Sequence, residues 1–455
     1  DHGKSGCTDR KRSITSTAES SRWKNGDLHF PSCKRQNGKG DHCENYKQRK
    51  QVTFQILKIR ILVLSSYLCN YILCVTEEVK SMKKIISFMK KETVLTIATL
   101  LAVVSAFFVK PDRQYIGYID FRTLGILFGL MVIMQGFQRT GLFDRIGKSL
   151  LQKTGKLWQL ILVLVMLCFF FSMLITNDVS LLTFVPFSIL VLKKCGQEQA
   201  MIPTVILQTV AANLGSMLTP IGNPQNLYLY GLMDCSIPEF MGILLPYTVM
   251  TFVLLLLSLL CIRGKGQEIS CRMEEGTEIK QSRKCRNLIY GLLFLLALLV
   301  VARILPYGVL VTAVFLYTII FDREALKGAD YALLVTFVSF FILIGNLGRI
   351  SLIREALERF VSGREILTGV LASQVISNVP AAVLLSGFTE NYRDLLVGVN
   401  LGGLGTLIAS MASLIAFKLY TKCYKENRGR YLRWFTLVNI IYLFLLLTAA
   451  LYLYR

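Results

Sequence analysis

Histidine is scarce in this sequence of 455 residues, and all three histidines (His2, His29 and His42) lie before residue 82. The apolar remainder therefore has no histidine for a proton relay, a haem ligand or a histidine-bound metal. The twelve cysteines form no CxxC pair, which argues against a zinc or redox motif. No GxxxxGK[ST] motif occurs, so an ATP-driven pump is disfavoured, and no nucleophile–base constellation indicates a membrane enzyme.

Charged residues are also few. They make up 18% of the chain, whereas hydrophobic residues make up 53% and the mean hydropathy is +0.51. A water-soluble protein of this length could not cover that much apolar surface. Several apolar runs are long enough to cross a bilayer, which predicts an all-α polytopic membrane protein. The formal net charge of +22 then belongs to loops that orient helices and face anionic lipid, and we expect no nucleic acid partner.

Composition divides the chain into four parts. Residues 1–53 are polar and basic without apolar periodicity, whereas a lysine-flanked apolar helix typical of an inner-membrane protein begins at Met82. We therefore expect a multi-pass protein of the inner (plasma) membrane, embedded in the lipid bilayer. The parts are a non-native or disordered leader at 1–81, a first transporter repeat at 82–262, a cytoplasmic linker at 263–285 and a second repeat at 286–455.

Two apolar segments differ from simple membrane spans. Residues 157–193 and 364–390 each have a polar break at mid-depth, ITNDVS (175–180) and ISNVPA (376–381). A segment broken there can leave the bilayer on the side it entered, which predicts two re-entrant hairpins. The inner loops then carry about three times as many Lys and Arg as the outer segments, as the positive-inside rule requires. The predicted spans lie near 93–109, 119–137, 199–232, 239–262, 286–303, 306–321, 331–347, 392–417 and 434–454.

The second half of the chain repeats the first. DFRTLGILFGLMVIMQGFQRTGL (120–142) aligns with DYALLVTFVSFFILIGNLGRISL (330–352), and NLGSMLTPIGNPQNL (213–227) aligns with NLGGLGTLIASMASL (400–414). The distribution of loop charge gives the two halves opposite orientations. Inverted repeats with broken helices are typical of secondary transporters whose binding site lies near the midplane.

The segment LTPIGNPQN (218–226) places poor helix formers inside an apolar span. Pro220 and Pro224 remove helix donors, so the span is expected to unwind there. The freed carbonyls and the amides of Asn223, Gln225 and Asn226 are then expected to face an aqueous cavity. Unwound carbonyls suit a small cation, and half-helix N-termini suit an anion. A simple proline kink is the alternative.

The two hairpin tips carry the remaining candidates. Thr176, Asn177 and Asp178 are placed at the first tip, and Ser377 and Asn378 at the second. A carboxylate at membrane depth is a functional candidate because burying its charge is costly, so Asp178 would bind Na⁺ or carry a proton. Capping of the helix that follows is the alternative, and the two roles are compatible.

These motifs resemble the ion transporter superfamily. Over about 94–420 the chain is similar to the citrate-transporter-like permeases, which include divalent anion:sodium symporters, arsenite permeases and one class of Na⁺/H⁺ antiporters. TPIGNPQN (219–226) resembles the unwound-helix signature of that family. In the carboxylate symporters both tips read Ser-Asn-Thr and contact substrate and sodium. Here Asn177 and Asn378 match but neither threonine does, and the Asn-Asp of the first tip is closer to the arsenite permeases.

The resemblance implies an elevator-like motion of the hairpin domain, usually in a homodimer. The sequence thus predicts a secondary active transporter of a small anion, a carboxylate or an inorganic oxyanion, coupled to Na⁺ or H⁺ and without other cofactors. A Na⁺/H⁺ antiporter or an arsenite efflux permease is the alternative, and an ion channel is a third class. The expected substrate-binding residues are Thr176, Asn177, Ser377, Asn378 and Asn226. The expected ion-binding residues are Asp178, Asn177, Gly222, Asn223, Asn378 and Thr406.

Overall fold

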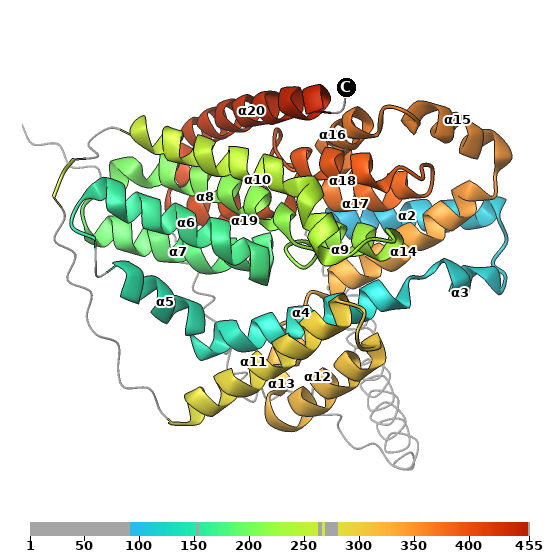
Figure 1. Cartoon of the computed structure of the whole chain (residues 1–455), viewed down its shortest axis with the longest axis horizontal. Coiled ribbons are helices and arrows are strands. Elements are labelled where there is room, and N and C mark those ends of the chain that lie inside the picture. The colour runs from blue at the N-terminus through green and yellow to red at the C-terminus, as the bar shows by residue number, and fades with distance from the viewer. Residues whose placement is uncertain (1–91, 152–153, 263–265, 269–280, 454–455) are drawn as a thin grey trace, which may run out of the picture. The chain divides into compact units, whose positions relative to one another are not determined.

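The structure is a computed structural model that describes residues 92–453 except 152–153, 263–265 and 269–280 (Figure 1). The expectations for the leader at 1–81 and for most of the linker at 263–285 lie outside the described residues. Helices account for the regular structure of the described part, where no β-strand forms. Seven helical segments among these residues are long and apolar enough to cross a membrane, which confirms an all-α polytopic membrane protein.

The element order follows the predicted repeat. The first half comprises α2 (Thr93–Phe108), α3 (Gln114–Tyr118), α4 (Phe121–Thr140), α5 (Leu142–Leu151), α6 (Leu157–Ile175), α7 (Asn177–Lys194), η1 (Glu198–Ala200), α8 (Met201–Gly215), η2 (Ser216–Leu218), α9 (Pro224–Leu232) and α10 (Ile237–Leu260). The second half comprises α11 (Gln281–Val301), α12 (Tyr307–Phe321), α13 (Arg323–Lys327), α14 (Tyr331–Gly348), α15 (Ser351–Val361), α16 (Glu365–Ile376), α17 (Asn378–Ser386), α18 (Tyr392–Leu401), α19 (Met411–Cys423), η3 (Lys425–Asn427) and α20 (Arg428–Leu453).

Equivalent helices of the two halves begin in the same way. Asp120 caps α4 by accepting a hydrogen bond from the backbone N–H of Thr123 at 3.0 Å. Asp330 caps α14 by accepting one from the backbone N–H of Leu333, also at 3.0 Å. A carboxylate at this position satisfies a backbone donor and interacts favourably with the helix dipole. The two aligned aspartates are therefore structural, and they set where each repeat enters its first long helix.

Both spans that were predicted to be broken are broken. Residues 219–223 separate η2 from α9, and residues 402–410 separate α18 from α19. Gly222 is required in the first break, because a Cβ atom there would lie 2.0 Å from the carbonyl oxygen of Ser216. Pro224 then opens α9 at a position where its missing N–H is not needed. An unwound segment therefore replaces the simple kink.

Both candidate hairpins reverse direction. Gln208 of α8 bridges the two arms of the first, donating to the carbonyl of Leu164 at 3.1 Å and to the hydroxyl of Ser188 at 2.7 Å. In the second, Thr389 donates to Glu365 across the base at 2.9 Å. The reversals occur at Thr176 and Ser377, whose φ angles of 71° and 75° lie in the region that favours glycine. That the tips end inside the bilayer stays a prediction.

The two halves exchange their first helices. α2 packs against α14, and α12 packs against α4 (Figure 1). Arg139 at the end of α4 pairs with Asp322 after α12. Arg349 at the end of α14 pairs in the same way with Asp112 after α2, at 2.8 Å. The aligned arginines thus bind aligned aspartates of the opposite half, and we call α2, α4, α12 and α14 the scaffold.

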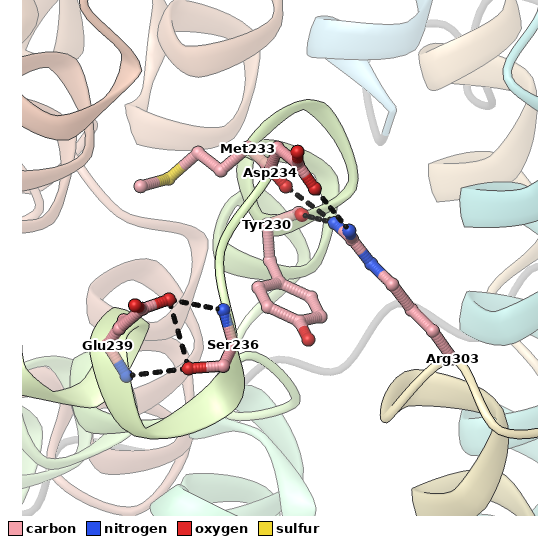
Figure 2. A network of polar contacts seen from close by, with 6 residues as sticks. All are labelled: Tyr230, Met233, Asp234, Ser236, Glu239 and Arg303. Atoms are coloured by element: carbon pink, nitrogen blue, oxygen red, sulfur yellow. Dashed lines mark hydrogen bonds and ion pairs between the residues drawn. The ribbon is translucent and has the colours of Figure 1, made fainter.

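A further arginine joins the scaffold side to the end of the broken span. Arg303, between α11 and α12, donates to the carbonyls of Tyr230 and Met233 at the C-terminal end of α9 (Figure 2). Its guanidinium also lies 5.1 Å from the centre of the Tyr230 ring and 3.4 Å from Asp234. A cation at a helix C-terminus satisfies orphan carbonyls and the helix dipole. Arg303 therefore fixes the far end of α9 against the α11–α12 connection.

Candidate functional site

The first hairpin tip is fastened to the break in its own half. The backbone N–H of Asn177 donates to the carbonyl of Gly222 at 3.1 Å. The hydroxyl of Thr219 donates to the carbonyl of Met173 on the hairpin arm. Two of the predicted site residues, Asn177 and Gly222, are therefore in direct contact. Because the contact uses backbone atoms, it does not depend on the side chains at either position.

The second tip is fastened to the second break by the equivalent atoms. The backbone N–H of Asn378 donates to the carbonyl of Ala409, which aligns with Gly222, at 2.9 Å. The hydroxyl of Thr406 donates to the carbonyl of Gln374, which occupies the position of Met173, at 3.3 Å. The hydroxyl of Ser377 also donates to the carbonyl of Ala409, at 3.4 Å. Each half thus forms one cluster of hairpin tip and broken helix.

An asparagine of each half reaches into the cluster of the other. Asn213 at the end of α8 accepts a hydrogen bond from the hydroxyl of Ser410 at 2.9 Å and donates to Ser413 at 3.1 Å. It also accepts one from the side-chain amide of Asn177 at 3.3 Å. Asn213 is buried, so these bonds satisfy an amide that water does not reach easily. The first tip and the second break are therefore connected through one side chain.

The reverse contact is made by Asn400 at the end of α18, the residue that aligns with Asn213. Its amide oxygen accepts a hydrogen bond from Asn223 at 3.1 Å, and its amide nitrogen donates to Asn226 at 2.7 Å. Asn223 and Asn226 align with Ser410 and Ser413. The two broken helices therefore cross with reciprocal hydrogen bonds, and the predicted residues of both halves belong to one connected polar site.

The amides of the first break differ from their expectation. Asn223, Gln225 and Asn226 are at most 1% exposed rather than open to a cavity. The amide nitrogen of Asn226 donates to the carbonyls of Met217 at 2.8 Å and Thr219 at 3.0 Å. Carbonyls freed by unwinding must find donors when water is scarce, and the nearest side-chain amides supply them. In this conformation these residues maintain the break.

Two predicted residues stand apart from this network. Asp178 donates its backbone N–H to the side-chain oxygen of Asn177 at 2.9 Å, but its own Oδ1 is buried without a hydrogen-bond partner in the described structure. That oxygen therefore does not cap α7, the alternative role for Asp178. Thr406 is exposed, and its backbone N–H and hydroxyl both bond to Gln374. Thr176 is half-buried at the reversal itself.

Several residues of the network were missed as site residues. Asn213, Asn400, Ser410 and Ser413 were aligned as repeat text without a role, although the repeated Asn-Leu-Gly marks both crossing asparagines. Gln374 was missed as well. Its amide nitrogen donates to the carbonyls of Gly402 and Leu404, each at 2.9 Å. A lone glutamine in an apolar hairpin arm was the available signal, since such a group needs partners at membrane depth.

Comparison with known proteins gives the family. A family model described as citrate transporter matches residues 71–392. The uncharacterized transporter MJ0456 of Methanocaldococcus jannaschii is 32% identical over 333 residues, 73% of this chain and 90% of that protein. The inner membrane protein YbiR of Escherichia coli is 30% identical over 328 residues, 70% of this chain and 86% of its own length. The human P protein is 29% identical over 134 residues, 28% of this chain and 16% of that protein.

These matches confirm the resemblance drawn from the unwound-helix motif and the tips. The family model covers more than half of the chain, including α2 to α17 and both hairpin tips. The broken spans and the repeated order of elements fit a transport protein. The chain is a multi-pass membrane transporter and belongs to the citrate transporter family.

Proposed function

We propose that this protein is a secondary active transporter that moves a small anion, a carboxylate or an inorganic oxyanion, coupled to Na⁺ or H⁺. One observation carries the proposal: four helices, α7, α9, α17 and α19, begin at the connected polar site, and one unpartnered carboxylate lies beside them. Helix N-termini carry partial positive charge and free N–H groups, so their assembly at membrane depth favours an anion.

The carboxylate favours the coupling ion. A buried carboxylate oxygen without a partner is unfavourable unless a cation binds it or a proton neutralises it. Asp178 lies in the first turn of α7, directly after Asn177, so its occupancy bears on the same tip that would hold the anion. We propose Thr176, Asn177, Asn226, Ser377 and Asn378 for the substrate. For the ion we propose Asp178 with Asn177, Gly222, Asn223, Asn378 and Thr406.

Further parts of the proposal extend the family resemblance. The hairpins and broken helices would move as one body against the scaffold, in an elevator-like motion and within a homodimer. Placement in the inner (plasma) membrane is supported by the basic loops and by the printed name of the Escherichia coli relative. A Na⁺/H⁺ antiporter is the second candidate, because the unpartnered oxygen of Asp178 would suit that exchange equally.

The test is transport by the purified full chain in liposomes. Radiolabelled citrate, succinate, sulfate and arsenite are offered under an imposed Na⁺ gradient, an imposed pH gradient, or neither. We expect one of the two gradients to accelerate uptake of one anion class. Proton release driven by Na⁺ in the absence of any anion would support the antiporter. Electrical conductance that no gradient couples to solute would overturn a carrier in favour of a channel.

A further inference from the structure

A cavity of about 410 Å³ lies between the scaffold and the first hairpin. Gln138 near the end of α4 and Phe143 of α5 form one wall. The other wall is a single face of α7. It consists of Leu182, Thr183, Pro186, Phe187 and Leu190. None of these seven lining residues is charged.

The α7 wall presents polar groups that lack protein partners. Thr183 is 8% exposed, and its hydroxyl oxygen is buried with no hydrogen bond in the described structure. Pro186 has no N–H, so the carbonyl of Leu182 loses its helical partner. Unpaired groups of this kind are costly unless water reaches them, and the cavity has room for several water molecules. The cavity is therefore best understood as hydrated.

The hydrated face leads to Asp178. Leu182 follows Asp178 by one helical turn, so the two lie on the same side of α7. The oxygen of Asp178 that lacks a partner is thus one turn above the uppermost lining residue. At the other end, Lys193 and Lys194 finish α7, in the loops expected to be cytoplasmic. Unpaired oxygens run from the basic end of the hairpin to its carboxylate.

The equivalent face in the second half is closed and apolar. Val383 and Leu384 of α17 occupy the positions of Leu182 and Thr183, and Val383 is 1% exposed. α17 packs against α14 and α9 there. Tyr228 of α9 donates or accepts a hydrogen bond with Ser386 at 2.9 Å, and its ring contacts Phe341 of α14 at 5.6 Å. Access along a hairpin is thus built into one half.

We infer that the cavity between α4, α5 and α7 is the hydrated route by which the coupling cation, Na⁺ or hydrated H⁺, reaches Asp178 from the side of the basic loops. The inference rests on the proposed coupling role of Asp178. A hydroxyl and a free carbonyl offer oxygen ligands to a small cation, and the lining offers no positive charge to an anion. Thr183 and Gln138 are positioning residues of this route rather than ligands of the transported anion.

Thiol labelling tests the route without any transport assay. Thr183→Cys is made in a background where the native cysteines are replaced, and vesicles of both orientations are treated with cationic and anionic methanethiosulfonate reagents. We expect labelling from the basic-loop side, about tenfold faster with the cationic reagent once the intrinsic reactivities are divided out. The exposed native Cys423, retained alone, provides those reactivities. Val383→Cys is the matched control and is expected to stay unlabelled from that side.

Transport then tests the role of the route. Thr183→Val should raise the half-saturating coupling-ion concentration about tenfold and leave the half-saturating anion concentration within twofold. A folded Thr183→Cys protein that resists reagents from both sides would overturn the inference. So would an unchanged ion dependence in Thr183→Val. Labelling as expected in a protein that transports no anion would uphold the hydrated route and reject the proposed function.

Discussion

The two halves of this transporter share a backbone framework but not its chemistry. In both, the backbone N–H of the tip asparagine donates to a carbonyl of the break. In both, an asparagine at the end of the preceding helix enters the opposite cluster. Asp178, however, is matched by Val379, and the amide-rich NPQN of the first break is matched by SMAS in the second. The first half carries the charge, and the second supplies an equivalent frame without it.

The difference shows which interactions the architecture requires. Contacts made by backbone atoms survive any change of side chain, so the geometry of tip and break is retained where the sequences of the halves diverge. Side chains that are not needed for that geometry are free to differ, and Asp178 is one of them. A residue that breaks the symmetry without stabilising the fold is the best candidate for a role in transport.

The largest effect is expected from removing the asymmetry. Asp178→Asn keeps the size of the side chain but removes its charge, and losing a charged ligand in a desolvated site costs roughly 2–4 kcal/mol, or about 30- to 1,000-fold in ion affinity. Transport measured against ion concentration should lose its ion dependence or shift it to that extent. Thr406→Ala removes a neutral hydroxyl and should have a milder effect. Unchanged ion dependence in Asp178→Asn at matched expression would leave Asp178 without a coupling role.

The second effect tests the shared framework. Asn400→Ala leaves the buried amides of Asn223 and Asn226 without their partner, whereas Asn213→Ala leaves the hydroxyls of Ser410 and Ser413. An unsatisfied buried polar group costs about 1–3 kcal/mol, so both substitutions should lower the thermal midpoint of the detergent-solubilised protein. Hydroxyls rotate to new acceptors more readily than amides, so Asn400→Ala should lower it further. Equal midpoints for both variants and wild type would show that the crossing does not stabilise the fold.

The smallest effect concerns the ion pairs that join the halves at the scaffold. Asp322 is buried and also accepts a hydrogen bond from Tyr290, whereas Asp112 is half-exposed, so Asp322→Asn should lower the thermal midpoint more than Asp112→Asn. The hydrogen bond from Arg349 holds the pKa of Asp112 below its ordinary value. The stabilisation by this pair is therefore complete above that ordinary pKa and is lost as the pH falls through the lowered value.

Thermal midpoints measured from neutral to acidic pH check the sign. Wild type should exceed Asp112→Asn at neutral pH, and the gap should close in acid. A gap that widens toward low pH would contradict the assignment.

The sequence was informative where structure is local. Prolines and Gly222 mark the first break, polar residues mark both reversals, and apolar length marks the spans, because each effect acts within a few residues of its cause. The functional roles of Asn213 and Asn400 were not predicted, since their partners lie far away in the sequence. The amides at 223, 225 and 226 were predicted to face a cavity, because a sequence does not show which donors will meet freed carbonyls.

The exchange of first helices between the halves constrains how the protein is made. α2 and Asp112 are synthesised early, but their partners on α14 emerge only after about 240 further residues, since Asp112 and Arg349 are 237 positions apart. At translation rates of about 5–20 residues per second, α2 would wait roughly 10–50 seconds in the membrane before α14 arrives. During that interval an early helix lacks its packing surface and its counter-charge. Insertion of the first half therefore precedes its folding, and a chain interrupted before α14 would leave a membrane-inserted but unassembled half.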